Sequence, residues 1–377
     1  MGQDLRTSPA TGQQEDVMPL MGIDHVEYYV GNARQAAYFY TQAFGFKVAA
    51  YCGPETKVRD RASWLLQQGD ARFVMTGAMG PESPIAEHVF RHGDGVKDVA
   101  FRVPDATHAY EYTTKQGATG VIEPAVNEDD HGKVVRSAIA AYGDTIHSFI
   151  ERENYSGPFL PGYRAEEAIP DDGPEVGIEL IDHVVCNVEL GKMDEWAKFY
   201  ARVLGFDQLV HFRDDQISSD YTALMSKVMW DGVGRVKLPI NEPAPSKKKS
   251  QIDEYLEFYR GPGVQHIAML SKDIIKSVDA LRKRGVRFIR VPKSYYEALR
   301  DRIGKIDESM DDVERLNILA DRDEEGYLLQ IFTRNVQDRP TMFYEIIDRH
   351  GSRGFGLGNF KELFLAIERE QAERGNL

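Results

Sequence analysis

The sequence predicts an α+β protein of two duplicated domains, each a pair of βαβββ modules, with a helix at the C-terminal end. The two halves of the chain carry the same short strings in the same order. Each string opens on an apolar, β-branched run and continues into a stretch of helical periodicity. The length of 377 residues suits two domains that each bury a core.

Composition excludes several classes of protein. Lys and Arg number 46 against 60 Asp and Glu, a net charge of −14, which argues against binding to a nucleic-acid backbone. A run of about 18 apolar residues, the length of a membrane span, does not occur. The first twenty residues lack the apolar core of a secretory signal. Only Cys52 and Cys186 are present, so we expect a reduced, cytoplasmic protein.

Local composition divides the chain into four segments. Residues 1–19 are polar and predict a disordered tail. Residues 153–177 are rich in Pro, Gly and acids and predict a linker. We therefore expect an N-terminal domain over 20–152 and a C-terminal domain over 178–377.

The repeat is clearest in residues 22–51 and 180–212. Both contain I-D-H-V, a helical stretch, F-Y and then G-F, and His25 aligns with His183. GVKDVAF at 95–101 likewise matches GVQHIAM at 263–269, and each is followed by a helix-like stretch that ends at a Gly. In 192–203 the apolar residues recur at helical spacing. A sheet built from such modules curls around a central cavity.

Strand periodicity brings three chemically active side chains onto apolar faces. His183 shares a face with its neighbours at 181 and 185, His266 with 264 and 268, and Glu345 with 343 and 347. Burial of such groups is costly unless they have partners. Two His and one carboxylate form the facial triad of non-haem iron(II) oxygenases. The alternative is that each His is an ordinary structural residue, because the wide spacing has no motif specificity.

The duplication supplies an internal comparison. The N-terminal counterparts of His183 and His266 are His25 and Asp98, and matching SFIER to EIIDR makes Ser148 the counterpart of Glu345. This set lacks one imidazole and the carboxylate at the third position. We expect the first domain to be degenerate and metal-free, with a role in scaffolding or oligomer contact.

Longer strings resemble the 4-hydroxyphenylpyruvate dioxygenase family of tyrosine breakdown. They are LPINEPA at 238–244, KKSQIDEYLEFY at 248–259, GPGVQHIA at 261–268, ADRDEEGYLLQIFT at 320–333, DRPTMFYEIIDRHG at 338–351 and GFGLGNFKELFLAIEREQ at 354–371. YSGPFLPGY at 155–163 is also similar to the family. The resemblance covers nearly the whole chain after the tail.

The resemblance implies the vicinal oxygen chelate fold, with iron(II) held by His183, His266 and Glu345. It implies conversion of 4-hydroxyphenylpyruvate and O2 to homogentisate and CO2, by oxidative decarboxylation, ring hydroxylation and side-chain migration. The α-keto acid of the substrate would chelate the iron, and no separate 2-oxoglutarate is needed. The family also suggests a homodimer. No catalytic residue beyond the metal site is predicted.

The pocket around the substrate is expected to combine amides with aromatic rings. The expected residues are Ser226, Asn241, Gln251, Gln265, Gln330, Phe332, Phe343, Phe355, Asn359 and Phe360. Each amide could instead satisfy a turn or a strand edge. Strict alternation puts Gln265 on the face opposite His266, so we expect it to act through a bulge or behind the ligand.

The C-terminal segment predicts a lid helix. Asn359 with Glu362 resembles an N-cap followed by an acid, and Phe360, Leu363, Phe364 and Ile367 form an apolar stripe. Plain surface packing is the alternative. As a lid, the helix would exclude water from the reaction, with 351–359 as its hinge. Leu357 stands where many family members carry Lys, which could alter gating.

Two rival functions stay open. Hydroxymandelate synthase uses the same substrate and triad but hydroxylates the benzylic carbon, and PINEP with FGLGNF favours the homogentisate-forming branch. A metal-free ligand-binding member of the fold would require the triad to be empty.

Overall fold

The computed structural model describes residues 17–212 and 223–376, apart from the side chains of Leu357, Phe360 and Lys361. The first half forms a nine-stranded sheet in the order β6-β7-β8-β5-β1-β4-β3-β2-β9. Its strands are β1 Gly22–Tyr29, β2 Lys47–Cys52, β3 Arg61–Gln68, β4 Ala71–Ala78, β5 Gly95–Arg102, β6 Gly120–Asp129, β7 Gly132–Ala140, β8 Ile146–Glu151 and β9 Arg164–Ala165. Its helices are α1 Ala33–Phe44, α2 Pro84–His92 and α3 Ala106–Lys115, with a 3₁₀ turn at Pro54–Thr56.

The second half repeats this plan in an eight-stranded sheet of order β11-β12-β13-β10-β14-β17-β16-β15. Its strands are β10 Ile178–Asn187, β11 Asp207–Phe212, β12 Leu224–Trp230, β13 Lys237–Pro243, β14 Gly263–Ser271, β15 Leu319–Arg322, β16 Tyr327–Phe332 and β17 Phe343–His350. Its helices are α4 Met193–Leu204, α5 Gln251–Tyr259, α6 Ile274–Lys283, α7 Lys293–Arg302, α8 Met310–Leu316 and α9 Leu357–Glu373. The predicted α+β fold of two duplicated domains with a C-terminal helix is confirmed.

The repeated strings correspond to equivalent structural positions. β1 and β10 carry I-D-H-V, and α1 and α4 carry F-Y. Gly45 ends α1 with φ 73° and Gly205 ends α4 with φ 71°. Glycine is preferred there because a left-handed conformation strains residues that carry a Cβ. Tyr40 and Tyr200, from the F-Y pairs, are both buried toward the core.

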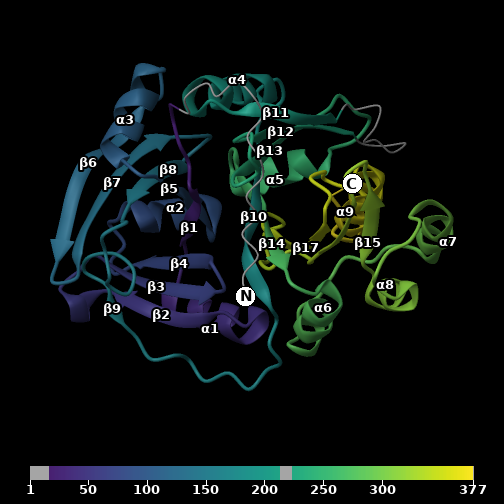
Figure 1. Ribbon diagram of the computed structural model, residues 1–377, viewed down its shortest axis with the longest axis horizontal. Helices are drawn as coiled ribbons and strands as arrows, with labels where there is room; N and C mark the ends of the chain where they lie inside the picture. The colour runs from purple at the N-terminus through teal and green to yellow at the C-terminus, as the bar shows by residue number, and fades with distance from the viewer. Residues whose placement is uncertain (1–16, 213–222, 377) are drawn as a thin grey trace.

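The two sheets lie side by side, with β10 near the middle of the molecule and α9 beside the second sheet (Figure 1). One continuous apolar core includes residues of both halves. Tyr344 of β17 joins them most directly, because its hydroxyl lies 2.9 Å from that of Tyr28 and 2.7 Å from that of Tyr40.

The segment 153–177, expected to be a linker, packs on the first sheet over part of its length. Arg164–Ala165 pairs with β2 as the short strand β9, which residue composition did not predict. Phe159 is buried in a cluster with Leu65 and Val74. In Figure 1 the rest of the segment runs as a long loop from the first half to β10.

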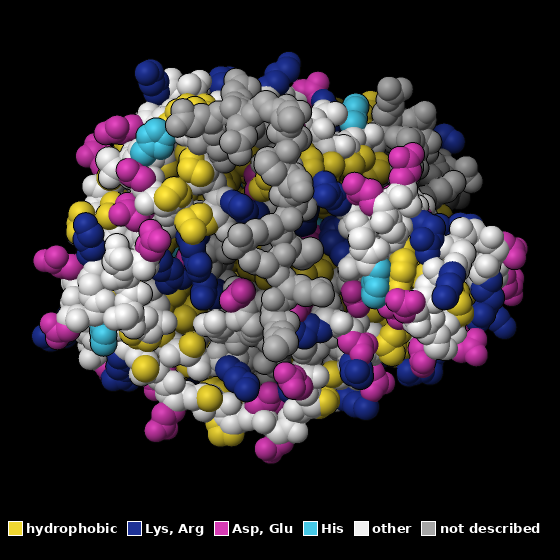
Figure 2. Space-filling model, in the orientation of Figure 1, with side chains coloured by type: hydrophobic (Ala, Val, Ile, Leu, Met, Phe, Trp, Pro, Cys, Tyr) yellow, Lys and Arg dark blue, Asp and Glu magenta, His cyan; other side chains and the backbone are white. Residues whose placement is uncertain are grey.

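Charged side chains of both signs are mixed over the surface of the molecule. On the face drawn in Figure 2, Lys and Arg side chains are interspersed with Asp and Glu side chains. Within residues 17–212 and 223–376, no helix is long and apolar enough to cross a membrane.

Candidate metal centre

The three predicted ligands lie on three adjacent strands at the centre of the second sheet. β14 pairs with β10 on one side and with β17 on the other. Ala268 of β14 is in register with His183 of β10 and with Glu345 of β17. His266 lies two residues before Ala268 and therefore points to the same face of the sheet. The small Ala268 side chain lies between the two flanking ligands in this row.

The ligand atoms converge at a buried point. Nε2 of His183 lies 3.2 Å, and Nε2 of His266 3.5 Å, from Oε2 of Glu345. One ligand atom from each residue lies within 4.8 Å of the others, and all three residues are buried. The structure thus brings together three residues that are far apart in the sequence.

Hydrogen bonds behind the ligands fix which ring nitrogen faces the centre. Nδ1 of His183 lies 2.7 Å from a carboxylate oxygen of Asp182, and Nδ1 of His266 lies 3.0 Å from Oε1 of Gln265. Both Nδ1 atoms therefore donate, and Nε2 of each neutral ring presents a lone pair to Glu345. Lone pairs facing a carboxylate need a proton or a metal ion between them, so this donor set fits a divalent cation.

The pKa shifts follow from the same contacts. Burial disfavours an imidazolium at His183, but Glu345 and Asp182 outweigh burial and raise the pKa of His183. Burial lowers the pKa of His266. At Glu345 burial raises the pKa, but the two imidazoles outweigh it and hold the pKa below its usual value. The carboxylate is therefore ionised at neutral pH and available to a cation.

Asp182 is one of the residues that sequence reasoning missed. It accepts a hydrogen bond from Lys237 Nζ at 2.9 Å and two from Arg349, at 2.9 and 2.8 Å. Burial raises the pKa of Asp182, but these two cations and His183 outweigh burial and hold it well below its usual range. The available signal was the I-D-H-V repeat, because Asp24 contacts His25 in the same way at 2.8 Å.

Aromatic rings surround the two imidazoles. Phe343 stacks on His266 at 4.7 Å between ring centroids, and Phe332 meets the same ring edge-on at 5.9 Å. Phe355 meets His183 edge-on at 4.9 Å. Three of the four predicted phenylalanines thus lie at the site. The side chain of the fourth, Phe360, lies outside the described part of the chain, as does that of Leu357.

A row of buried polar groups extends from the centre across β10, β13 and β12. Asn187 is in register with Asn241, and Asn241 with Ser226. Nδ2 of Asn241 lies 3.4 Å from Oε1 of Gln265, which also contacts His266. Asn187 was not predicted, although it lies four residues after His183 on the same strand. Gln265 contacts His266 from behind, and the register between β10 and β14 shifts at Gln265, because Val185 pairs with His266 and Cys186 with Val264. Both arrangements expected for Gln265 are therefore present.

Several buried polar atoms of this row and of other predicted site residues have no partner within the described protein. They are Asn187 Nδ2, Ser226 Oγ, Asn241 Oδ1, Gln251 Oε1 and Asn359 Nδ2. Leaving a buried polar atom unpaired costs about 1–3 kcal/mol. Asn187, Asn241 and Ser226 belong to the row described above, so their unpaired atoms indicate a polar ligand or ordered water on this side of the site.

Asn359 is not the N-cap that the sequence predicts, and its place at the substrate stays a prediction. The helix α9 begins at Leu357, and the residue before it is Gly356, so Asn359 does not cap the helix. Its Oδ1 accepts a hydrogen bond from the Tyr295 hydroxyl at 2.7 Å. Its Nδ2 lies near Gly356, as does Nε2 of Gln330, because a Cβ at Gly356 would meet them at 3.2 and 2.9 Å. The tight approach, at φ 69°, explains the glycine.

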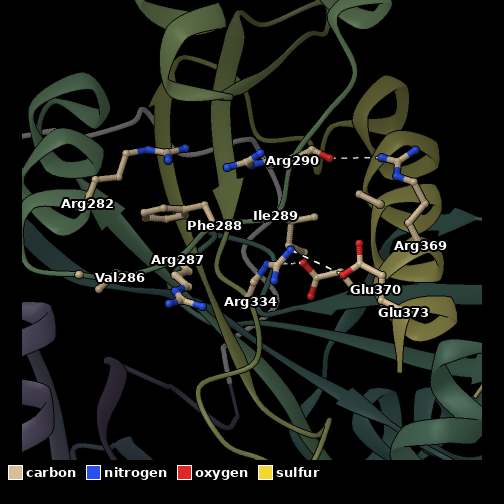
Figure 3. A pocket seen from close by; sticks show the side chains of 12 residues that line it. Arg282, Val286, Arg287, Phe288, Ile289, Arg290, Arg334, Arg369, Glu370 and Glu373 are labelled. Atoms are coloured by element: carbon tan, nitrogen blue, oxygen red, sulfur yellow. Dashed lines mark hydrogen bonds and ion pairs between the residues drawn. The ribbon is translucent and has the colours of Figure 1, made fainter. Parts of the chain in front are cut away.

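Helix α9 is attached to the second sheet by packing and by charge. Phe364 is buried, and Leu363 and Ile367 pack against the core. Figure 3 shows a cavity of about 590 Å³ between α9 and residues 282–290. There Arg334 pairs with Glu370 at 2.7 Å, and Arg369 donates to the carbonyl of Arg290 at 3.2 Å.

The counterpart set in the first domain has protein partners. Asp98 accepts hydrogen bonds from the backbone N of Ser148 at 2.9 Å and from Arg136 at 3.1 Å. His25 is paired with Asp24. A guanidinium thus supplies positive charge at Asp98, where His266 of the second domain is a candidate ligand. The absence of a metal from this set stays a prediction.

Two models of protein families match this chain and define the class of protein to which it belongs. Residues 180–331 match the glyoxalase/bleomycin resistance protein/dioxygenase superfamily. Residues 14–158 match the N-terminal domain of hydroxyphenylpyruvate dioxygenase. The fold and the site therefore define a protein of the glyoxalase and dioxygenase class.

Relatives over the full length define the family. A 4-hydroxyphenylpyruvate dioxygenase from Yarrowia lipolytica is 46% identical over 94% of this chain and 93% of its own length. One from Dictyostelium discoideum is 47% identical over 94% of this chain and 100% of its own length. The chain belongs to the 4-hydroxyphenylpyruvate dioxygenase family of enzymes.

Solved structures agree with the fold. A mutant of 4-hydroxymandelate synthase from Streptomyces coelicolor superposes with a TM-score of 0.82 and 34% identity, over 94% of this chain and 100% of that one. A fusion of a xylose isomerase-like TIM barrel with a 4-hydroxyphenylpyruvate dioxygenase has a TM-score of 0.72 and 23% identity, over 94% of this chain and 53% of that one. The latter supports the fold alone.

Proposed function

We propose that this enzyme binds iron(II) at His183, His266 and Glu345 and converts 4-hydroxyphenylpyruvate and O2 to homogentisate and CO2. The observation that carries the proposal is the convergence of two imidazole lone pairs and one carboxylate at a buried point. The family supports the reaction, because its relatives are named for this dioxygenase activity. Tyrosine catabolism is the physiological setting we expect.

Iron(II), when bound, would supply the activation of O2 and a chelation site for the α-keto acid. The residues of this chain orient the substrate and exclude water. Phe343, Phe332 and Phe355 give the substrate ring an apolar wall, and the row from Asn241 to Ser226 offers hydrogen bonds to its phenol. Helix α9 closes the site, which protects reactive intermediates from solvent.

We also propose the division of labour expected from the sequence. The second domain, 178–377, holds the reaction site, and the first domain, 20–152, serves as a scaffold for it. The homodimer expected from the family is part of this proposal, and sedimentation velocity of the full chain tests it.

Formation of 4-hydroxymandelate is the second candidate, because the structural neighbour from Streptomyces coelicolor is a 4-hydroxymandelate synthase. Sequence identity favours formation of homogentisate. The 4-hydroxyphenylpyruvate dioxygenases are 46% and 47% identical to this chain, whereas the synthase is 34% identical.

Product identification tests the proposal. The purified protein receives iron(II), a reductant, 4-hydroxyphenylpyruvate and O2, and the products are separated by chromatography against standards. Mass alone is insufficient because homogentisate and 4-hydroxymandelate are isomers. Homogentisate supports the proposal. Hydroxymandelate keeps the metal site but overturns the assigned reaction, and no turnover by iron-loaded protein points to another α-keto acid.

A further inference from the structure

A second group of potential metal ligands lies in the first domain, away from the proposed iron site. His88 and His92 are one turn apart on α2, and Asp144 follows β7. One ligand atom from each lies within 4.8 Å of the others. The spacing of four residues places both imidazoles on one face of the helix.

Both ring nitrogens of His92 face oxygen atoms. Nδ1 contacts the backbone carbonyl of Tyr259, and Nε2 lies 2.9 Å from Oδ2 of Asp144. A carbonyl only accepts, so Nδ1 donates to it, and Nε2 of the neutral ring turns a lone pair toward the carboxylate. A metal ligand imidazole commonly donates its other N–H to a backbone carbonyl in this way. A proton or a metal ion must lie between Nε2 and Asp144.

The surroundings of His88 favour a metal ion over a proton at this position. His88 is 5% exposed, and neither of its ring nitrogens has a hydrogen-bond partner among residues 17–212 and 223–376. Its ring lies 4.7 Å from that of His92 between centroids. A neutral imidazole carries one N–H and one lone pair, so His88 has a lone pair to offer a cation. A lone proton shared by His92 and Asp144 would leave this buried imidazole unsatisfied.

We propose that His88, His92 and Asp144 bind a divalent cation of the zinc class, with water at the remaining position. Two imidazoles and one carboxylate are a ligand set that zinc accepts. A tetrahedral zinc ion with bonds of about 2.1 Å holds its ligand atoms roughly 3.4 Å apart, so the 2.9 Å contact between His92 and Asp144 would have to widen by about 0.5 Å to admit the ion. Asp144 is 45% exposed on its side chain, so the ion can enter from solvent.

Two basic groups lie near the site without filling it. Arg91 Nη1 is 3.4 Å from Oδ2 of Asp144, and its side chain is 49% exposed, so water screens its charge. Lys97 donates to the backbone carbonyl of Asp144 rather than to the carboxylate. The carboxylate keeps lone pairs for a cation.

The site lies at the junction of the two domains. The ring of Tyr259, at the end of α5, stacks on His92 at 4.3 Å. Tyr259 lies seven residues before His266, and β14 begins between them at Gly263. A bound ion would therefore fix the side chain of His92, which contacts the segment that leads into the proposed iron site. This assignment revises the expectation of a metal-free first domain.

The test counts metal ions in the full chain. Apo-protein prepared with chelator is dialysed against Zn²⁺, and bound zinc is measured by mass spectrometry. Zinc also enters a 2-His-1-carboxylate site, so we expect two ions in the wild type, one in His183→Gln and one in His88→Gln. The exposed His131 supplies a control, and His131→Gln should keep two. Circular dichroism checks that each variant is folded, and Glu345→Gln replaces His183→Gln if the latter is not.

The outcomes separate the two proposals. A count of one ion in the wild type, none in His183→Gln and one in His88→Gln overturns the second site and leaves the first intact. A count of one in the wild type, one in His183→Gln and none in His88→Gln supports the second site and contradicts the first. If His183→Gln holds one ion, zinc-edge X-ray absorption of that variant should report nitrogen and oxygen ligands, and the double variant His183→Gln with His88→Gln should bind no zinc.

Discussion

Asp182 shows how a single carboxylate organises the candidate iron site. It holds the ring of His183 in one tautomer and is itself held by Lys237 and Arg349. Its own oxygens are fully used by these donors, so it acts on the metal through His183 as a positioning residue. The first domain has the same pair, Asp24 and His25, without the other ligands.

Replacing Asp182 with Asn should weaken iron(II) binding roughly 10–100-fold, since an amide oxygen is a poorer acceptor for the N–H of His183. Equilibrium titration of iron(II) into the apo-protein measures this. Asp24→Asn is the matched control and should leave iron affinity unchanged. Equal affinity in the wild type and Asp182→Asn would contradict the role given to Asp182.

Asp24 itself should make stability depend on pH. Burial raises its pKa, but His25 and Arg152 outweigh burial and hold the pKa of Asp24 well below its ordinary value. A carboxylate with a depressed pKa stabilises the folded state above its unfolded pKa of about 3.9 and loses this effect as pH falls below it.

Asp24→Asn should therefore lower the free energy of unfolding by roughly 3 kcal/mol at neutral pH, because Arg152 loses a buried partner. The difference in the free energy of unfolding between the variant and the wild type should become smaller as pH falls below about 4. Urea unfolding of both proteins at several pH values measures it. A difference that stays constant down to pH 2 would contradict the assigned shift.

At the scale of elements, α9 depends on anchors at its far end. Arg374 donates to both oxygens of the buried Glu254 of α5, and Asn376 donates to the same carboxylate at 2.7 Å. Gln371 donates to the carbonyl of Lys249 at 3.0 Å. These bonds fix the end of the helix that lies away from Phe355 and Asn359.

Arg374→Gln should loosen α9 without touching the metal ligands. Removing one partner of a buried ion pair lowers the free energy of unfolding by roughly 3–5 kcal/mol. We expect a smaller loss here, because Asn376 still donates to the carboxylate of Glu254. We expect faster amide hydrogen exchange over residues 357–373, a higher KM for the keto acid and unchanged iron affinity. Arg353→Gln, in a pair with Glu325 that is 59% and 51% exposed, is the control. Unchanged exchange in Arg374→Gln would argue against this anchor.

How far the sequence predicts these elements depends on the range of the forces involved. Strand alternation and helical spacing are local, so the faces of His183, His266 and Glu345 followed from their neighbours. The contacts of Asn359 did not follow from its neighbours, because its partner Tyr295 lies on α7 and the local pattern resembled a helix cap. Asn187 was missed because only the pairing of β10 with β13 places it beside Asn241.

Across the whole molecule, the two domains share one core rather than a thin contact. Tyr28 and Tyr40 of the first domain meet Tyr344 of the second, which stands between Phe343 and Glu345 on β17. The duplication predicted the architecture, because equivalent strings fold alike. It did not predict how the copies join, since this contact depends on the packing of one copy against the other.

Tyr344→Phe should lower stability by about 1–3 kcal/mol, because the hydroxyls of Tyr28 and Tyr40 lose their common partner. The urea midpoint measures this. Tyr38→Phe is the control, since Tyr38 is 57% exposed. An unchanged midpoint in Tyr344→Phe would show that the network adds nothing to the joint between the domains.

The central claim is that His183, His266 and Glu345 hold the iron of this enzyme. Diffraction from crystals of iron-loaded protein, collected on both sides of the iron absorption edge, tests it most directly. The account predicts an anomalous peak bonded to Nε2 of His183, Nε2 of His266 and a carboxylate oxygen of Glu345. Active crystals without a peak there, or with iron bound elsewhere, would contradict it.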